Sequence, residues 1–198
     1  MHCLMSEIEQ TAAENKRSGV PPVLKKTAVM VGMMGAGKTA VGRALALRLG
    51  VEFRDSDTEI EAAANMTVPE IFARDGEPFF RLKESQVISR LLKARPGILS
   101  TGGGAFLSEA NREMITREGV SVWLNAPIPV LWSRVKHRET RPLLRTANPR
   151  QTLTDLYEAR RGTYALADIE VPSDAGTSIE AMVDRVIAAL RTRPDVLQ

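Results

Sequence analysis

The pattern of apolar and polar positions predicts short buried strands that alternate with amphipathic helices. The short runs are apolar on both faces, which is typical of parallel strands covered on two sides, whereas the longer segments repeat their apolar positions at helical spacing. The expected strands span residues 27–31, 51–53, 97–100, 120–124 and 168–171. The expected helices span residues 37–49, 59–65, 69–74, 78–94, 108–117, 128–136, 151–164 and 178–190. This alternation predicts an α/β fold around a parallel sheet.

Both ends of the chain fall outside this pattern. Residues 1–25 are polar and lead into the first strand through Pro21-Pro22 and two lysines, so we expect a flexible extension. The last eight residues are expected to be frayed. The remainder, residues 26–198, has a length that suits one α/β domain.

Composition narrows the function classes. No apolar run approaches the roughly 18 residues of a membrane span, and the first residues lack the apolar core of a signal peptide, so we expect a cytoplasmic protein without a membrane partner. The net charge is only +3, but 20 of the 27 basic residues are arginine, whose planar fork suits carboxylate and phosphate. The basic residues are mixed with acids and aromatics are few, which argues against nucleic-acid binding.

One motif dominates the candidate chemistry. Residues 32–39 read GMMGAGKT, directly after the first strand and before a helix. Strand, glycine loop and helix in this order form a cradle for the phosphates of a nucleoside triphosphate, in which Lys38 reaches the outer phosphates and the Thr39 hydroxyl ligates Mg²⁺. We expect ATP as co-substrate, bound by Gly35, Ala36, Gly37, Lys38, Thr39 and Ala40.

Two acids follow the second expected strand, at the sheet edge where α/β proteins bind ligands. Asp55 and Asp57 are one residue apart and should point in different directions, one toward a metal and the other toward an acceptor. The alternative for Asp57 is a structural one, the N-cap of a helix over residues 58–64.

The region of residues 56–95 is expected to bind the acceptor. Arg81 and Glu84 are neighbours on one helix, so Glu84 could hold Arg81 against a substrate carboxylate, or the two could form a solvated ion pair. Gly102, Gly103 and Gly104 follow the third strand and leave room for a ligand against bare N–H groups, although a flexible turn is the alternative.

A segment rich in arginine and poor in periodicity spans residues 137–150. Its length inside a compact domain favours a functional loop, here a lid that excludes water from ATP. Its arginines could stabilise the charge on the transferring phosphoryl group, or form a solvated basic loop.

Taken together, these pieces resemble the shikimate kinase family. The resemblance covers nearly everything from Thr27 to Leu190. It rests on six segments in this order: GMMGAGKT (32–39), DSD (55–57), FFRLKE (79–84), TGGGA (101–105), RPLL (141–144) and RRGTY (160–164). It implies a three-layer αβα P-loop fold with a five-stranded parallel sheet in the order 2-3-1-4-5, with lid and acceptor-binding subdomains. It also implies ATP-dependent phosphorylation of the 3-hydroxyl of shikimate, by a monomer.

The resemblance implies roles for individual residues. Asp57 would bind the acceptor hydroxyls and orient or deprotonate the attacking one, while Asp55 would hold Mg²⁺ through water beside Thr39. The catalytic set would be Asp57, Lys38 and Arg141, with Arg141 on the phosphates of ATP. The substrate-binding set would be Asp57, Arg81, Gly102, Gly103, Gly104 and Arg160.

Several alternatives remain open at this point. The chain has Gly162 where the family often has proline, so Arg161 competes with Arg160 for the substrate carboxylate. Gluconate kinase and nucleoside-monophosphate kinase share the expected fold, whereas no guanine signature of a GTPase is present. A nucleotide-binding regulator without catalysis is the alternative from a different class, and the completeness of the candidate set argues against it.

Overall fold

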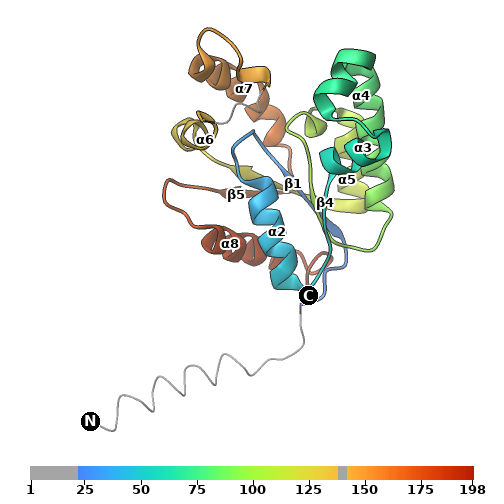
Figure 1. The fold of residues 1–198 in the computed structure, drawn as a ribbon. Helices are drawn as coiled ribbons and strands as arrows, with labels where there is room; N and C mark the ends of the chain where they lie inside the picture. The colour runs from blue at the N-terminus through green and yellow to red at the C-terminus, as the bar shows by residue number, and fades with distance from the viewer. Residues whose placement is uncertain (1–21, 138–141) are drawn as a thin grey trace, which may run out of the picture.

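The computed structural model describes residues 22–137 and 142–198 and shows one parallel sheet (Figure 1). All four strand pairs are parallel, and the strand order is β2-β3-β1-β4-β5. The strands are β1 (Thr27–Val31), β2 (Phe53–Asp55), β3 (Ile98–Ser100), β4 (Gly119–Asn125) and β5 (Ile169–Pro172). The strand order predicted from the resemblance is confirmed, and so is the number of strands that the apolar runs predicted.

Helices cover both faces of this sheet and make the three-layer arrangement. The helices are α2 (Lys38–Leu49), α3 (Ser56–Ala64), α4 (Val68–Leu92), α5 (Glu109–Glu118), α6 (Ile128–Val135), α7 (Pro149–Tyr164) and α8 (Ile179–Arg191), with 3₁₀ turns η1 (Ala105–Leu107) and η2 (Pro142–Leu144). Helices α2 and α8 pack together on one face, and α4 and α5 pack together on the other (Figure 1). Within the described ranges, no helix is long and apolar enough to cross a membrane.

One expected strand boundary is wrong for a local reason. The second strand begins at Phe53 rather than at residue 51, because Val51 still completes the end of α2: its N–H donates to the Ala46 carbonyl after Gly50 turns left-handed, with φ 64°. The break expected between residues 69–74 and 78–94 is confirmed as a kink inside α4. Its single non-helical residue is Gly76, with φ 81°, so glycine carries the kink that precedes Pro78.

The expectation of a frayed C-terminus is also wrong. Val23 and Lys25 donate their N–H groups to the carbonyls of Gln198 and Val196, and Gln198 donates back to Val23. Between these bonds, Leu24 and Leu197 are buried. The described fold therefore includes residues 22–25, which the sequence placed in the extension, whereas residues 1–21 lie outside the described part of the chain.

This terminal pairing generates a stability prediction. Leu197 is 2% exposed, so Leu197→Ala should lower the free energy of unfolding in urea by about 2–3 kcal/mol, because it removes buried methyl groups and leaves a cavity. The matched control is Leu47→Ala, since Leu47 is 85% exposed and its truncation should change stability by less than about 0.5 kcal/mol. Equal effects of the two substitutions would contradict the packed terminus.

Candidate active site

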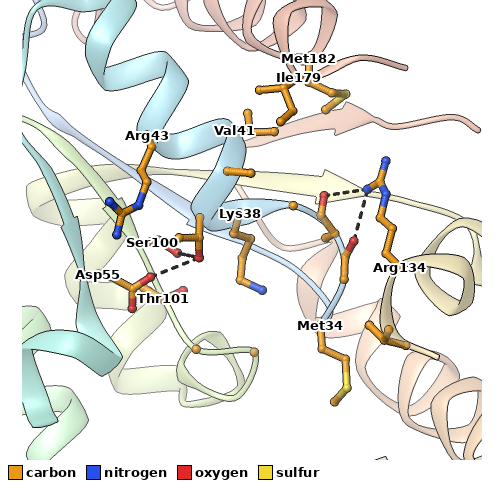
Figure 2. A pocket seen from close by; sticks show the side chains of 18 of the residues that line it. Met34, Lys38, Val41, Arg43, Asp55, Ser100, Thr101, Arg134, Ile179 and Met182 are labelled. Atoms are coloured by element: carbon orange, nitrogen blue, oxygen red, sulfur yellow. Dashed lines mark hydrogen bonds between the residues drawn. The ribbon is translucent and has the colours of Figure 1, made fainter. Parts of the chain in front are cut away.

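A pocket of about 740 Å³ opens at the carboxyl edge of the sheet (Figure 2). Its walls come from segments far apart in the chain: the glycine loop after β1, the ends of β2 and β3, the last turn of α6 and the start of α8. The parallel sheet explains this convergence, because all its strands end at the same edge.

The loop after β1 has the form of a phosphate cradle. Gly35 and Gly37 have φ of 83° and 97°, a region that favours glycine, and Gly37 is the residue before α2. The loop therefore ends at the N-terminus of a twelve-residue helix, where free N–H groups and the helix dipole favour an anion. Lys38 lies across this loop, and its Nζ donates to the carbonyls of Gly32 and Met33 at 2.8 and 3.1 Å.

Three side-chain oxygens meet beside the cradle. The Thr39 hydroxyl donates to Asp55 Oδ2 at 3.3 Å and lies 3.3 Å from the Ser100 hydroxyl (Figure 2). Hydroxyl and carboxylate oxygens are the donors that Mg²⁺ prefers, so these residues fit that ion next to a nucleotide phosphate. The sequence predicted Thr39 and Asp55 here but missed Ser100, a polar residue that ends the otherwise apolar strand β3.

The Asp57 carboxylate lies against Gly102, whereas the Asp55 carboxylate meets Thr39, so the two acids have different neighbours. The helix-capping alternative for Asp57 is wrong: Asp55 is the N-cap of α3, and its Oδ1 accepts from the Asp57 N–H at 3.1 Å. A buried oxygen of Asp57, Oδ1, has no partner among the described residues, and it lies 2.9 Å from where a side chain on Gly102 would begin. Burial and the Asp55 charge raise the pKa of Asp57, and the Lys38 charge opposes the shift.

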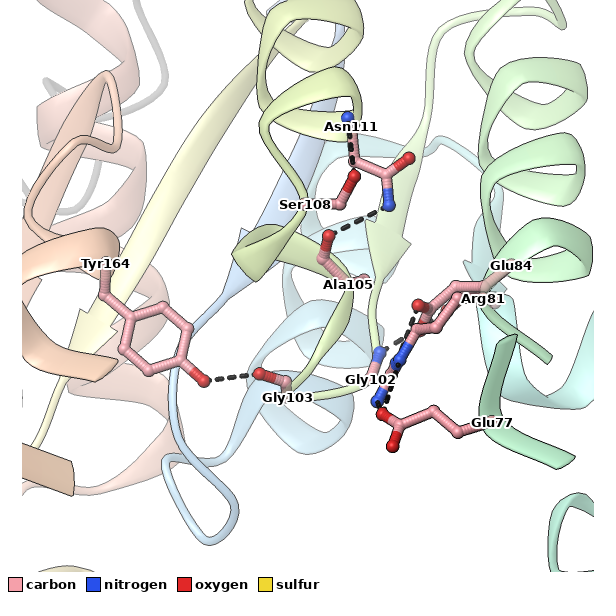
Figure 3. A network of polar contacts seen from close by, with 10 residues as sticks. Glu77, Arg81, Glu84, Gly102, Gly103, Ala105, Ser108, Asn111 and Tyr164 are labelled. Carbon is pink, nitrogen blue, oxygen red and sulfur yellow. Dashed lines mark hydrogen bonds and ion pairs between the residues drawn. The ribbon is translucent and has the colours of Figure 1, made fainter. Parts of the chain in front are cut away.

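Arg81 lies next to Gly104, between two acids of its own helix (Figure 3). Its Nη1 donates to Glu84 Oε2 at 2.8 Å, and its Nε and Nη2 donate to Glu77 Oε1 at 3.2 and 3.1 Å. The Glu84 side chain is only 1% exposed, so its ion pair with Arg81 is partly buried and fixes the guanidinium. The alternative of a solvated ion pair is wrong for these two residues. Burial raises the pKa of Glu84 even though Arg81 opposes the shift. The sequence missed Glu77, although it lies one helical turn before Arg81.

Two of the three glycines after β3, Gly102 and Gly104, let charged side chains approach the backbone. A Cβ on Gly104 would lie 2.5–2.8 Å from the Arg81 guanidinium, and one on Gly102 would meet the carboxylates of Asp57 and Glu84 at 2.9 and 3.3 Å. Side chains at these positions would push those groups aside. The flexible-turn alternative is therefore insufficient, because the glycines make room for specific neighbours.

Of the two predicted arginines outside α4, the structure describes Arg160 of α7 but not Arg141 of the expected lid. Arg141 lies outside the described residues, so its position at the phosphates stays a prediction. Arg160 is half-buried on the face of α7 that also carries Tyr157 and Tyr164, whereas Arg161 is exposed. The helical geometry thus favours Arg160 over Arg161 as the one that faces the protein.

Residues that the sequence did not assign close the other end of the pocket. Arg134 on α6 donates from Nη1 to the carbonyls of Gly35 and Ala36 at 3.2 and 3.3 Å, so it contacts the phosphate loop directly (Figure 2). Ile179 and Met182 of α8 add apolar lining. In the sequence, Arg134 is a single basic residue among the apolar positions of α6. Such a position does not by itself indicate contact with a nucleotide.

Comparison with known proteins resolves the family. The family model for shikimate kinase matches residues 34–191, which is most of the chain. The chain belongs to the shikimate kinase family. A shikimate kinase of Ruegeria pomeroyi is 67% identical over 194 residues, which cover 98% of this chain and 99% of that one. The solved shikimate kinase of Acinetobacter baumannii in complex with shikimate is 37% identical, with a TM-score of 0.79, and covers 85% of this chain and 95% of its own.

The gluconate kinase alternative shares the fold with the shikimate kinases. A solved gluconokinase of Sinorhizobium meliloti reaches a TM-score of 0.56 at 20% identity over 85% of this chain and 93% of that one. That likeness shows a common fold alone. The shikimate kinase family membership rests on the higher identities and on the family model.

The buried acids of this site generate a prediction for pH-dependent stability. The folded pKa values of Asp57 and Glu84 are raised above their ordinary values of 3.8 and 4.5, so the folded protein binds these protons more tightly than the unfolded chain. The free energy of unfolding should therefore fall as pH rises through the interval between the ordinary and the raised pKa values. Asp57→Asn should make this fall shallower and raise the neutral-pH Tm, measured by thermal unfolding from about pH 4 to about pH 8. A slope identical to that of the parent would contradict a destabilising Asp57 carboxylate.

Proposed function

We propose that this member of the shikimate kinase family transfers the γ-phosphoryl group of ATP to the 3-hydroxyl of shikimate, with Asp57 at the attacking hydroxyl. The observation that carries this proposal is the placement of a half-buried carboxylate, Asp57, and a held guanidinium, Arg81, against the Gly102–Gly104 loop, which lies beside the phosphate cradle. Shikimate offers the matching groups, one carboxylate and three hydroxyls on a small ring. The product, shikimate 3-phosphate, continues toward chorismate and the aromatic amino acids.

The nucleotide half of the reaction uses the loop of residues 35–40. Its N–H groups and the α2 N-terminus bind the phosphates, and the Lys38 ammonium follows the γ-phosphoryl group as charge moves to the leaving oxygen. Thr39 and Asp55 would hold Mg²⁺, with Asp55 acting through water and Ser100 beside them. When bound, that ion would neutralise phosphate charge. Arg134, Ile179 and Met182 lie where the rest of the nucleotide extends from the loop.

The acceptor half uses both sides of the Gly102–Gly104 loop. Arg81 and Arg160 bind the substrate carboxylate through charge-assisted hydrogen bonds, and the loop backbone lines the ring. Glu84 and Glu77 fix the Arg81 guanidinium before substrate arrives, which reduces the entropy lost on binding. Asp57 accepts a hydrogen bond from the attacking hydroxyl, and its raised pKa makes it a better proton acceptor than an exposed carboxylate.

Phosphoryl transfer to a sugar-like hydroxyl must exclude water as a competing acceptor. The segment of residues 137–150 contains Arg141, follows α6 and extends into the first turn of α7, which begins at Pro149. We propose it as the lid, with Arg141 on the transferring group. We also propose that the enzyme is cytoplasmic. We propose that it works as a monomer, because one chain supplies every residue in this scheme.

The experiment that tests the role of Asp57 is Asp57→Asn. This change keeps the size of the side chain but removes the proton acceptor, so kcat should fall about a hundredfold or more while ATP affinity stays near that of the parent. ADP release in a coupled assay measures kcat, and equilibrium titration measures ATP binding. Asp184→Asn, an exposed acid on α8, is the matched control and should leave kcat unchanged. Near-normal turnover of Asp57→Asn would refute the assignment.

A second prediction separates the two neighbouring arginines of α7. Arg160→Ala should raise the KM for shikimate about 10- to 100-fold, because a hydrogen bond between two charged groups is lost. Arg161→Ala serves as the control and should change that KM by less than about twofold, since Arg161 is exposed. The reverse ranking in steady-state kinetics would move the carboxylate contact to Arg161.

A further inference from the structure

Tyr164 is the last residue of α7 and has only 1% of its surface exposed. Its phenol hydroxyl donates to the Gly103 carbonyl at 2.5 Å (Figure 3). A buried tyrosine requires a partner for its hydroxyl. Here the partner is Gly103, the middle residue of the Gly102–Gly104 loop, which we call the acceptor loop. One hydrogen bond therefore joins α7 to the loop that we place against the substrate.

The same tyrosine also contacts the support of the phosphate loop. Its ring stacks on Trp123 of β4 with centroids 6.3 Å apart. Trp123 in turn lies under the start of the phosphate loop, 3.2 Å from the position of a Cβ on Gly32. A Cβ on Gly103 would lie 3.7 Å from both the Gly32 carbonyl and the Tyr164 hydroxyl. Tyr164 thus lies where the two glycine loops approach each other.

Arg160 acts on the same phenol oxygen from one helical turn earlier. Burial raises the pKa of Tyr164, and the Arg160 guanidinium opposes the shift through its charge and a hydrogen bond. A tyrosine hydroxyl is protonated across the neutral range even at its ordinary pKa, so Tyr164 is able to donate to Gly103 there. With its proton given to Gly103, the oxygen is left to accept from Arg160.

We propose that Tyr164 is a positioning residue for the acceptor, which sets the Gly103 carbonyl and the Arg160 guanidinium at a fixed separation through one hydroxyl. This inference rests on the proposed function, since it assumes that Gly103 and Arg160 contact shikimate. Tyr164 itself does not touch the substrate in this scheme. Its loss should therefore weaken acceptor binding and alignment, and leave nucleotide binding unchanged.

The test is Tyr164→Phe, which keeps the ring on Trp123 and removes only the hydroxyl. The KM for shikimate should rise about tenfold, the size expected when a buried carbonyl loses its donor, while the KM for ATP stays within about twofold. The matched control is Tyr157→Phe on the same helix. Tyr157 is also buried, but its hydroxyl lies 3.2 Å from Asn125 Oδ1, outside the pocket lining. It should change neither KM by more than about twofold.

A second measurement distinguishes positioning from general loosening. In a double-mutant cycle with Arg160→Ala, the effect of Tyr164→Phe on the KM for shikimate should shrink, because Tyr164 acts partly through Arg160. Full additivity in the cycle, equal effects of the two tyrosine variants, or a parallel rise in the KM for ATP would each overturn the proposal.

Failure of the proposed function would look different. In that case the parent enzyme itself would not phosphorylate shikimate, whatever residue stands at position 164.

Discussion

The close approach of two backbone loops at one sheet edge is the constraint on which the site depends. The phosphate loop follows β1 and the acceptor loop follows β3, and these strands are hydrogen-bonded neighbours. The two loops therefore start side by side, and Gly103 comes near the Gly32 carbonyl. The phosphate loop also lies tightly against β4, because a Cβ at Gly32 would lie 2.9 Å from the Leu124 carbonyl. A phosphate donor and its acceptor can then be held within reach of each other without a large conformational change in the core.

The buried acids beside these loops lower the stability of the folded protein at neutral pH. Asp57 and Glu84 are carboxyl groups whose burial disfavours the ionised form, and each is only partly compensated by a nearby cation. Such partly satisfied groups are found where function requires them. Glu84 holds Arg81 through one oxygen, and among the described residues both acids keep a second, buried oxygen without a partner. Only Asp57 lines the pocket, so its oxygen has a position for a hydroxyl donor. The two acids border the same glycine, Gly102, but serve different purposes.

Sequence reasoning predicted the architecture and the catalytic loops because their signals are local. The GMMGAGKT spacing, the DSD pair and the three glycines each lie in one short segment, and each segment contributes residues to the pocket lining. Failures occurred where the decisive contact joins distant segments. The pairing of Val23 with Gln198, the contact of Arg134 with Gly35, and the bond from Tyr164 to Gly103 each connect residues more than 60 positions apart. Nothing in the local pattern indicates such partners, and Glu77 was missed only because a neighbouring acid, Glu84, offered a sufficient explanation for Arg81.

The central claim is that the Gly102–Gly104 loop, Asp57 and Arg81 select shikimate as the acceptor. The most direct measurement is ADP release from ATP and Mg²⁺ with shikimate, gluconate or a nucleoside monophosphate offered as the single acceptor. The account predicts acceptor-dependent turnover with shikimate alone, because a site built for one carboxylate and its hydroxyls rejects analogues that leave those groups unpaired. Comparable turnover with gluconate or with the nucleotide would contradict this account of the acceptor site while leaving the phosphate loop in place.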